Sequence, residues 1–408
     1  MSLSEILLLV LGAIAGAVVA PVYNKSVAAI SNVRRRRASV KRGQEGGAST
    51  LAKKMVQYYT ERGIASSLYV PTSIATTGPI ALLHDATIDI PAAVDLNSDP
   101  LFNCDHQLTR LPFDKAVLRR YRRRGARLFD GEFMWVQSVR LDGDELVELN
   151  IGRVNFYSYA TLLYRTQREI LSRWRRPVLH DRHLQSFRAA LGGGGLTPQA
   201  IGCMTALLVE GNDGTYVALA RRSAQVVNGP GSRSLVPVYG MECNAIAGRV
   251  SRYGLTFYNF VREFSEEFFD LEELVHMMIS RRVDPDWIFQ LPPAAEALSE
   301  AEAGRLILKR TGVGINPNDA ILNFAYVAHF TDPAFFERLL TQMRPNWENS
   351  PDSDLTIGAI EFVKLSDPSL DLLAADQLID PSSIFALDLA RQYVAGLAGE
   401  DQSAGAPT

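Results

Sequence analysis

Four acidic side chains recur at helical spacing in one short stretch of the sequence. They stand at positions i, i+3, i+4 and i+7: Glu263, Glu266, Glu267 and Asp270. In a helix this spacing places the carboxylates on one face, where like charges repel unless solvent or a cation offsets them. Mg²⁺ is a hard cation that binds carboxylate oxygens and retains several waters, which suits such a face beside a phosphate substrate. The alternative is a solvated acidic face on a core helix.

A second pattern in the same stretch predicts the helix that would carry these carboxylates. Apolar side chains recur at helical spacing and make one stripe: Phe257, Phe260, Val261, Phe264 and Phe268. Such a stripe is typical of an amphipathic helix whose apolar side packs on a core. We therefore expect a helix over residues 257–268, with the carboxylates on another face.

The order Arg-Glu-Phe-Ser-Glu-Glu at residues 262–267 resembles the centre of the Nudix box, the loop–helix–loop motif of Nudix hydrolases. Gly248 stands where that family has a glycine, fourteen residues before the arginine. Gly254 stands where the family has a glutamate, and Phe269 where it has a glycine, so both turns that flank the helix depart from the pattern. A second register stays open, in which Gly240 is the counterpart of the family's Pro-Gly-Gly turn and an insertion precedes the helix.

The resemblance implies roles for these side chains, because Nudix enzymes cleave a pyrophosphate bond of a nucleoside diphosphate attached to another group. Glu263, Glu266 and Glu267 match the family's ligands of Mg²⁺ or Mn²⁺, and one of them could double as general base. Arg262 matches the arginine that orients those carboxylates by charge-assisted hydrogen bonds. Gly254 removes a supporting carboxylate, and such an outer partner is typically worth about 10–100-fold in affinity or activity.

The strands around this helix follow the order of a Nudix domain. Residues 203–210 and 215–221 are apolar runs on either side of Gly-Asn-Asp-Gly at residues 211–214, which predicts a hairpin. A glycine-containing loop and then the carboxylate helix come next, so the resemblance covers residues 198–391, about half of the chain.

Three further side chains are candidates through the same resemblance. Arg221 and Arg222 end the second strand of the hairpin and are candidates for binding substrate phosphates. Their alternative role is that of ordinary charges at a strand end. Glu361, in an expected strand over residues 355–365, is the nearest candidate for a glutamate outside the box that completes the metal site.

Length and composition limit the class of protein. The chain has 408 residues, of which 47% are hydrophobic and 21% charged, as in a globular protein of two or three domains. Its net charge of −3 indicates no overall attraction to polyanions. Cys104, Cys203 and Cys243 lie far apart, which argues against a disulfide framework or a zinc site and is compatible with a reducing compartment.

Two stretches are nevertheless strongly basic. Residues 110–127 hold eight basic residues and one acidic residue, and residues 165–188 hold seven and two. Basic helices of this kind could bind nucleic acid, phosphorylated ligands or the anionic inner leaflet, or they could form a solvated surface. Because no recognised nucleic-acid motif accompanies them, a solvated surface is the favoured interpretation and nucleic acid is not the expected partner. The Nudix resemblance implies a nucleotide-type small molecule as the partner.

The amino-terminal part predicts a membrane anchor. Residues 6–23 carry no charge and are long enough for a span, and seven basic residues with no acidic one lie between residues 25 and 42. The positive-inside rule then leaves the bulk of the chain in the cytoplasm, with a single pass through the inner (plasma) membrane and the basic run on anionic headgroups. The alternative is an apolar helix buried in a partner. Gly12 and Gly16 form a Gly-x-x-x-Gly pair, which permits close helix association in lipid and would allow a homodimer.

We therefore expect an α/β chain with five parts. These are a transmembrane helix, a basic linker, a mixed α+β middle domain, a Nudix-like α/β/α sandwich and a disordered tail, over residues 1–24, 25–50, 51–191, 196–397 and 398–408. Four consecutive glycines at residues 192–195 mark the domain boundary. The leading hypothesis is a membrane-anchored cytoplasmic phosphohydrolase that cleaves a nucleoside diphosphate derivative with Mg²⁺. The alternatives are a catalytically weak nucleotide sensor of the same fold and a structural membrane-associated protein.

Overall fold

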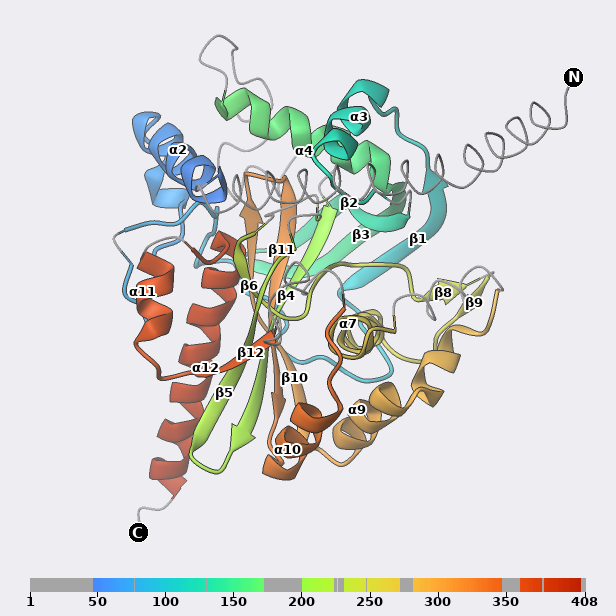
Figure 1. Ribbon diagram of the computed structural model, residues 1–408, viewed down its shortest axis with the longest axis vertical. Coiled ribbons are helices and arrows are strands. Elements are labelled where there is room, and N and C mark those ends of the chain that lie inside the picture. Colours follow the sequence, from blue (N-terminus) through green and yellow to red (C-terminus); the bar gives the residue numbers. More distant parts are fainter. Residues whose placement is uncertain are drawn as a thin grey trace, which may run out of the picture.

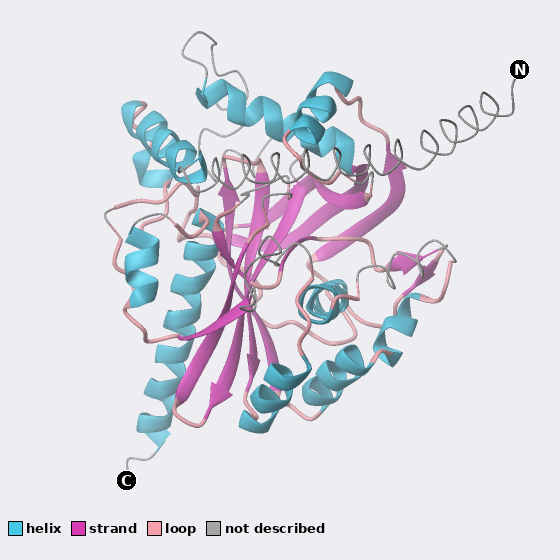
Figure 2. Cartoon of the chain, in the orientation of Figure 1, coloured by secondary structure: helices cyan, strands magenta, loops and turns pink. Residues whose placement is uncertain are grey.

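The computed structural model describes residues 47–404 apart from residues 77, 129–130, 172–199, 224–225, 227–230, 247, 272–281, 347–359 and 376–377. Within this part, ten strands form one mixed sheet with helices packed on both of its faces (Figure 1, Figure 2). The strands of this sheet are β1 Phe102–Thr109, β2 Glu132–Asp142, β3 Glu145–Asn155, β4 Ala200–Gly211, β5 Gly214–Arg221, β6 Arg233–Leu235, β7 Val238–Gly240, β10 Leu306–Asn316, β11 Ile321–Phe330 and β12 Ile360–Lys364. A separate two-stranded ribbon joins β8 Ala245–Ile246 and β9 Arg249–Val250.

The helices occupy the connections between these strands and both ends of the described chain. They are α2 Gly47–Glu61, α3 Lys115–Arg123, α4 Phe156–Leu171, α7 Leu255–Phe269, α9 Pro292–Glu302, α10 Pro333–Gln342, α11 Ser369–Ala375 and α12 Pro381–Ala404. Two short 3₁₀ helices are η1 Ala65–Ser67 and η2 Pro285–Gln290. Helix α2 begins inside the expected linker, and α12 continues to Ala404. Residues 405–408 of the expected tail lie outside the described residues.

Strand β4 lies at the centre of the sheet, which follows the order β1-β3-β2-β4-β11-β10. It pairs in parallel with β11, from Ala200 opposite Ile321 to Val209 opposite Phe330, and antiparallel with β5 and β7. Its first ten residues are all buried, as expected for a near-continuous apolar strand covered on both faces. The predicted hairpin of β4 and β5 is confirmed.

Alternate side chains of β4 point to opposite faces of the sheet and so enter different apolar clusters. Leu207 and Val209 belong to a cluster with side chains of α7, α9 and α10. Met204, Ala206 and Leu208 belong to another cluster, with side chains of α11 and α12. Helices therefore cover both faces of the sheet around β4 (Figure 1).

The expected fold class is wrong where it includes a transmembrane helix. In the described part of the chain, no helix is long and apolar enough to cross a membrane. The span expected over residues 1–24 lies outside the described residues, as does the linker before residue 47. What the structure supports is a mixed α/β fold with one large sheet.

The described chain on either side of the expected domain boundary belongs to one sheet. Strand β2 meets β4 at Trp135 opposite Ala200, and one apolar cluster contains Ile151 of β3 together with Ile201 of β4. The glycines expected to form the boundary, residues 192–195, lie outside the described residues. The division into two domains stays a prediction.

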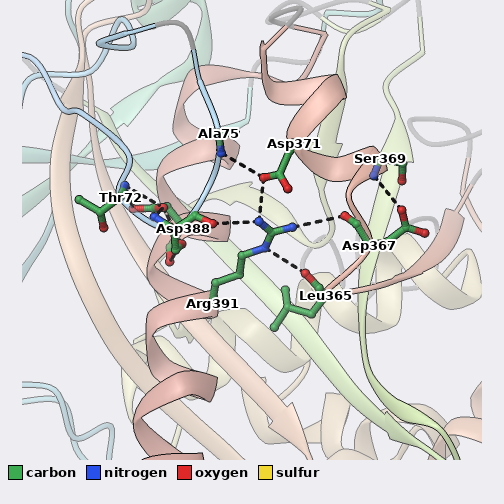
Figure 3. Close-up of polar contacts among 9 residues, drawn as sticks. Thr72, Ala75, Leu365, Asp367, Ser369, Asp371, Asp388 and Arg391 are labelled. Carbon is green, nitrogen blue, oxygen red and sulfur yellow. Dashed lines mark hydrogen bonds and ion pairs between the residues drawn. The ribbon is translucent and has the colours of Figure 1, made fainter.

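The segment before β1 runs along the edge strand β10 and is held against α12. It makes single bridges to β10 at Leu83 and Ala93, which cover backbone groups that an edge strand would otherwise expose. Asp388, fully buried on α12, accepts hydrogen bonds from Tyr69 Oη at 2.5 Å and from the backbone N–H of Ser73 at 2.6 Å. It also accepts from the backbone N–H of Thr72 at 3.1 Å (Figure 3). One carboxylate thereby anchors the start of the segment.

Arg391, on the same helix, reinforces this attachment. Its guanidinium donates to the carbonyl oxygens of Ser73 and Leu365 at 2.9 Å and to Asp371 Oδ1 at 2.8 Å (Figure 3). Burial alone would raise the pKa of Asp388, but hydrogen bonds from Ser73, Tyr69 and the backbone outweigh burial, and its pKa lies below the usual value. The ionised carboxylate is therefore the form that the fold stabilises.

We predict that Asp388→Asn lowers the free energy of unfolding by about 2–4 kcal/mol at pH 7, because hydrogen bonds to a buried charge are worth about 1.5–3 kcal/mol each. A lowered pKa means that this contribution is present above the pKa of the unfolded chain and is lost as the pH falls through the folded-state pKa. Urea unfolding of both proteins between pH 3 and 7 measures the difference, with the exposed Asp142→Asn as control. The prediction is contradicted if the difference in free energy of unfolding between the wild type and Asp388→Asn stays the same from pH 3 to 7.

Candidate active site

Helix α7 is the predicted carboxylate helix, and its existence is confirmed over Leu255–Phe269. The predicted apolar stripe packs on the sheet: Phe257, Phe260, Val261 and Phe268 are fully buried, and Phe264 lies 6.0 Å from the ring of Phe330 on β11. The stripe fixes which side of the helix faces the strands. This orientation in turn sets where the acidic side chains of the helix lie.

Two acidic residues of α7, Glu263 and Glu266, contact one buried arginine. The Arg262 side chain is 5% exposed, and its guanidinium nitrogens lie 2.5 Å from Glu263 Oε1 and 3.1 Å from Glu266 Oε1. Glu267, one residue further, acts on Glu263 through its charge. Asp270 is exposed and ends the helix in a left-handed conformation with φ of 55°.

The alternative of a solvated acidic face is wrong, because Glu266 and Glu267 are only 9% and 5% exposed. Burial is the main reason that the pKa of Glu263 lies well above its ordinary value. Arg262 lowers that pKa, whereas the charges of Glu266, Glu267 and Glu242 raise it. We call Arg262 and the carboxylates around it the Arg262 cluster. Its carboxylates carry more negative charge than one guanidinium balances.

Glu242 is a member of the cluster that the sequence reasoning missed. It follows β7, and its Oε2 lies 3.4 Å from Arg262 Nη1. Asn259 of α7 holds its backbone in place, since Oδ1 accepts from Glu242 N and Nδ2 donates to Glu242 O, both at 2.8 Å. The Glu242 side chain is 35% exposed, against 12% or less for Glu263 and Glu266. No motif marks a glutamate twenty residues before the arginine, so only the fold identifies it.

Gly254, where the family pattern has a glutamate, has no room for a side chain. Its N–H donates to Leu96 O at 2.8 Å. A Cβ atom there would lie 2.8 Å from Ser98 O and 3.0 Å from Asp95 O, both backbone atoms. The segment before β1 therefore occupies the space that the family's glutamate would need, and Glu242 contacts the arginine from a different loop.

The other predicted site residues contact different elements. Arg221 is exposed at the end of β5, and the charge of Arg222 acts on Asp380 at the start of α12. Glu361 of β12 forms an ion pair of 2.9 Å with Arg233 of β6. Neither of these two contacts, within the described part of the chain, involves a carboxylate that pairs with Arg262. The roles of these side chains stay predictions.

The cluster has the chemistry of a divalent-cation site. Its donors are carboxylate oxygens, which suit Mg²⁺ or Mn²⁺, and their charge exceeds that of Arg262. Within the residues that the structure describes, however, no three His, Cys, Asp or Glu side chains are arranged to hold a metal ion. The carboxylates of Glu263 and Glu266 are turned toward the guanidinium instead.

No family model matches this chain, and no curated protein matches it either. The Nudix resemblance therefore rests on residues 262–267 and on the order of the elements around them.

We predict that Gly254→Ala lowers the free energy of unfolding by about 1–3 kcal/mol, because a Cβ atom would force backbone atoms apart. The matched control is Gly240→Ala, where the nearest atom to a Cβ is 4.0 Å away. Urea unfolding of both variants measures the difference. Equal stability of the two would mean that the backbone of residues 95–98 does not pack on the start of α7.

We predict that Glu263→Gln melts at a higher temperature than the wild type at pH 8 and at the same temperature near pH 4, in EDTA. Because the pKa of Glu263 is raised in the folded protein, the contribution of its protonated carboxyl group to stability is fully present below the pKa of an unfolded glutamate. This contribution is lost as the pH rises through the folded-state pKa. Glutamine resembles the protonated form and avoids that loss. The exposed Glu302→Gln serves as control. A lower melting temperature of Glu263→Gln at pH 8 contradicts the prediction.

Proposed function

We propose that this protein is a Nudix-like pyrophosphohydrolase that acts on a nucleoside diphosphate derivative with Mg²⁺ or Mn²⁺. The observation that carries the proposal is the convergence of Glu242, Glu263 and Glu266 on the buried Arg262. Arg338 also pairs with three carboxylates, but its side chain is 40% exposed, whereas that of Arg262 is 5% exposed. Each additional buried charge adds a desolvation cost, which makes the Arg262 group costly for the fold alone. Groups with strongly perturbed pKa values gather at functional sites, which supports a role for Glu263.

The resemblance and the cluster together suggest a division of roles. Glu263, Glu266 and Glu267 would hold the ion. A bound divalent ion would supply neutralisation of the diphosphate charge and a lower pKa for a bound water. Arg262 orients two of the carboxylates by charge-assisted hydrogen bonds. Glu242, the most exposed of the carboxylates that contact Arg262, is the one best able to exchange protons with solvent.

A second candidate function is nucleotide binding without turnover. The observation that favours it is the packing at Gly254, where backbone atoms of residues 95–98 exclude the glutamate of the family pattern. The carboxylates are also mostly enclosed. A site of this kind could bind a nucleotide and signal its presence while hydrolysing it slowly.

The test is a screen of the full chain against nucleoside triphosphates, nucleoside diphosphate sugars and dinucleoside polyphosphates, with Mg²⁺, Mn²⁺ or EDTA. Released phosphate products measure hydrolysis, and the melting temperature measures binding. Hydrolysis that requires the ion supports the enzyme. A ligand-induced shift without products supports the binding module.

We predict that the double change Glu266→Gln and Glu267→Gln abolishes the ion-dependent activity or shift. In EDTA the same change should leave the melting temperature unchanged or raised, because it relieves repulsion among buried carboxylates. The matched control, Glu302→Gln with Glu337→Gln, also removes two charges, but from exposed positions on α9 and α10. It should change neither readout. If the double variant keeps the shift of the wild type, these carboxylates do not hold an ion.

A further inference from the structure

Helix α3 and the residue that follows it form a concentrated basic surface. Between Lys115 and Arg124, six of ten residues are basic and none is acidic. The apolar side chains Val117, Leu118 and Tyr121 are buried against α4, so the basic side chains all lie on the solvent side. We name this the α3 basic surface, and its members are Lys115, Arg119, Arg120, Arg122, Arg123 and Arg124. Figure 1 shows α3 beside α4 at one end of the molecule.

Within the described part of the chain, none of these six side chains forms an ion pair. Elsewhere arginines are paired, as Arg338 is with Glu296 at 2.6 Å. On α3, Arg122 instead donates to Tyr157 Oη at 3.0 Å and lies 5.9 Å from the centre of that ring. Arg120 likewise donates to the hydroxyl of Tyr164. These contacts hold the guanidinium groups in place without neutralising them.

This arrangement carries an electrostatic cost that α3 offsets only in part. Arg119 and Arg123, and likewise Arg120 and Arg124, are four residues apart, and each like-charge pair at that spacing destabilises a helix by about 0.2–0.5 kcal/mol. The helix dipole favours Arg120, Arg122 and Arg123, which lie in the last turn, but it does not remove the repulsion between these side chains and Arg119. The whole chain has a net charge of −3, so it contains more acidic residues than basic ones, but none of the described acidic residues forms an ion pair with α3. An anionic partner would remove the repulsion on binding.

We propose that the α3 basic surface binds the phosphodiester backbone of a single-stranded nucleic acid. Five of the six basic side chains are arginines, whose planar fork donates two hydrogen bonds to one phosphate. Aromatic rings lie among them: Phe113 is 39% exposed and packs edge-on against Tyr157. Such rings stack on unpaired bases. Attraction to a lipid surface depends on charge and requires neither the guanidinium fork nor the rings.

The binding mode makes the salt dependence the informative measurement. Each phosphate contact on a single strand contributes about −0.7 to the slope of log K against log salt concentration. Removing two contacts should therefore flatten the slope by about 1.4 and weaken binding about 25-fold at 0.1 M salt. The exposed pair Arg119 and Arg123 is suited to this test, because neither side chain contributes to the apolar packing with α4.

The experiment is fluorescence anisotropy of a labelled 20-nucleotide polyuridine with the full chain at 50, 100 and 200 mM KCl. We expect Arg119→Gln with Arg123→Gln to show the weaker affinity and the flatter slope. The corresponding lysine substitutions keep the charge and should retain the slope while losing part of the affinity, because lysine lacks the fork. The control, Arg140→Gln with Arg249→Gln, also removes two exposed arginines, each already paired with a carboxylate. It should bind as the wild type does.

Three outcomes overturn the proposal. One is no binding of the oligonucleotide by the wild type at 50 mM KCl. Another is an identical slope for the wild type and the Arg119→Gln, Arg123→Gln variant, with circular dichroism showing that both are folded. The last is that the Arg119→Gln, Arg123→Gln variant no longer binds vesicles that contain phosphatidylserine but still binds the oligonucleotide as the wild type does. That result would assign the surface to a membrane.

Discussion

One buried ion pair, between Arg310 of β10 and Asp99, links the segment before β1 to the sheet and to the start of α7. Arg310 Nη2 lies 3.0 Å from Asp99 Oδ1, and the two side chains are 1% and 4% exposed. Arg310 also donates to Pro91 O at 2.5 Å, and Thr256, in the first turn of α7, donates to Asp99. Loss of either partner would leave a buried charge uncompensated, at a cost of about 3–5 kcal/mol. The pair therefore holds this segment between the sheet and α7.

Arg310 and Arg262 are both buried, but their charges are balanced differently. Arg310 has one carboxylate, Asp99, and lies within 6.0 Å of three aromatic ring centres, which suits a structural role. Arg262 has three carboxylates within 3.4 Å, and the pKa of Glu263 is raised as a result of burial and of its acidic neighbours. Excess negative charge of this kind is unfavourable for the fold alone, and it is the physical basis of the proposed function.

The sequence determined the elements that depend on neighbours a few residues away. The apolar stripe of α7 and the turn between β4 and β5 were both predicted, because helical spacing and turn residues are local signals. The basic character of α3 was also visible, because its charges are adjacent in the chain. Helical spacing grouped Glu263 and Glu266 on one face, and the resemblance to the Nudix box implied that Arg262 orients them.

The tertiary structure alone decided what surrounds these elements. Glu242 reaches Arg262 from a loop twenty residues earlier, and Asp99 reaches Arg310 across 211 residues. The burial of the α7 carboxylates and the exclusion of a side chain at Gly254 follow from the same long-range packing. Local periodicity carries no information on such contacts, because they depend on which distant segments the fold brings together. The sequence thus predicted the helix and its charges, and the fold decided that these charges are buried around one arginine.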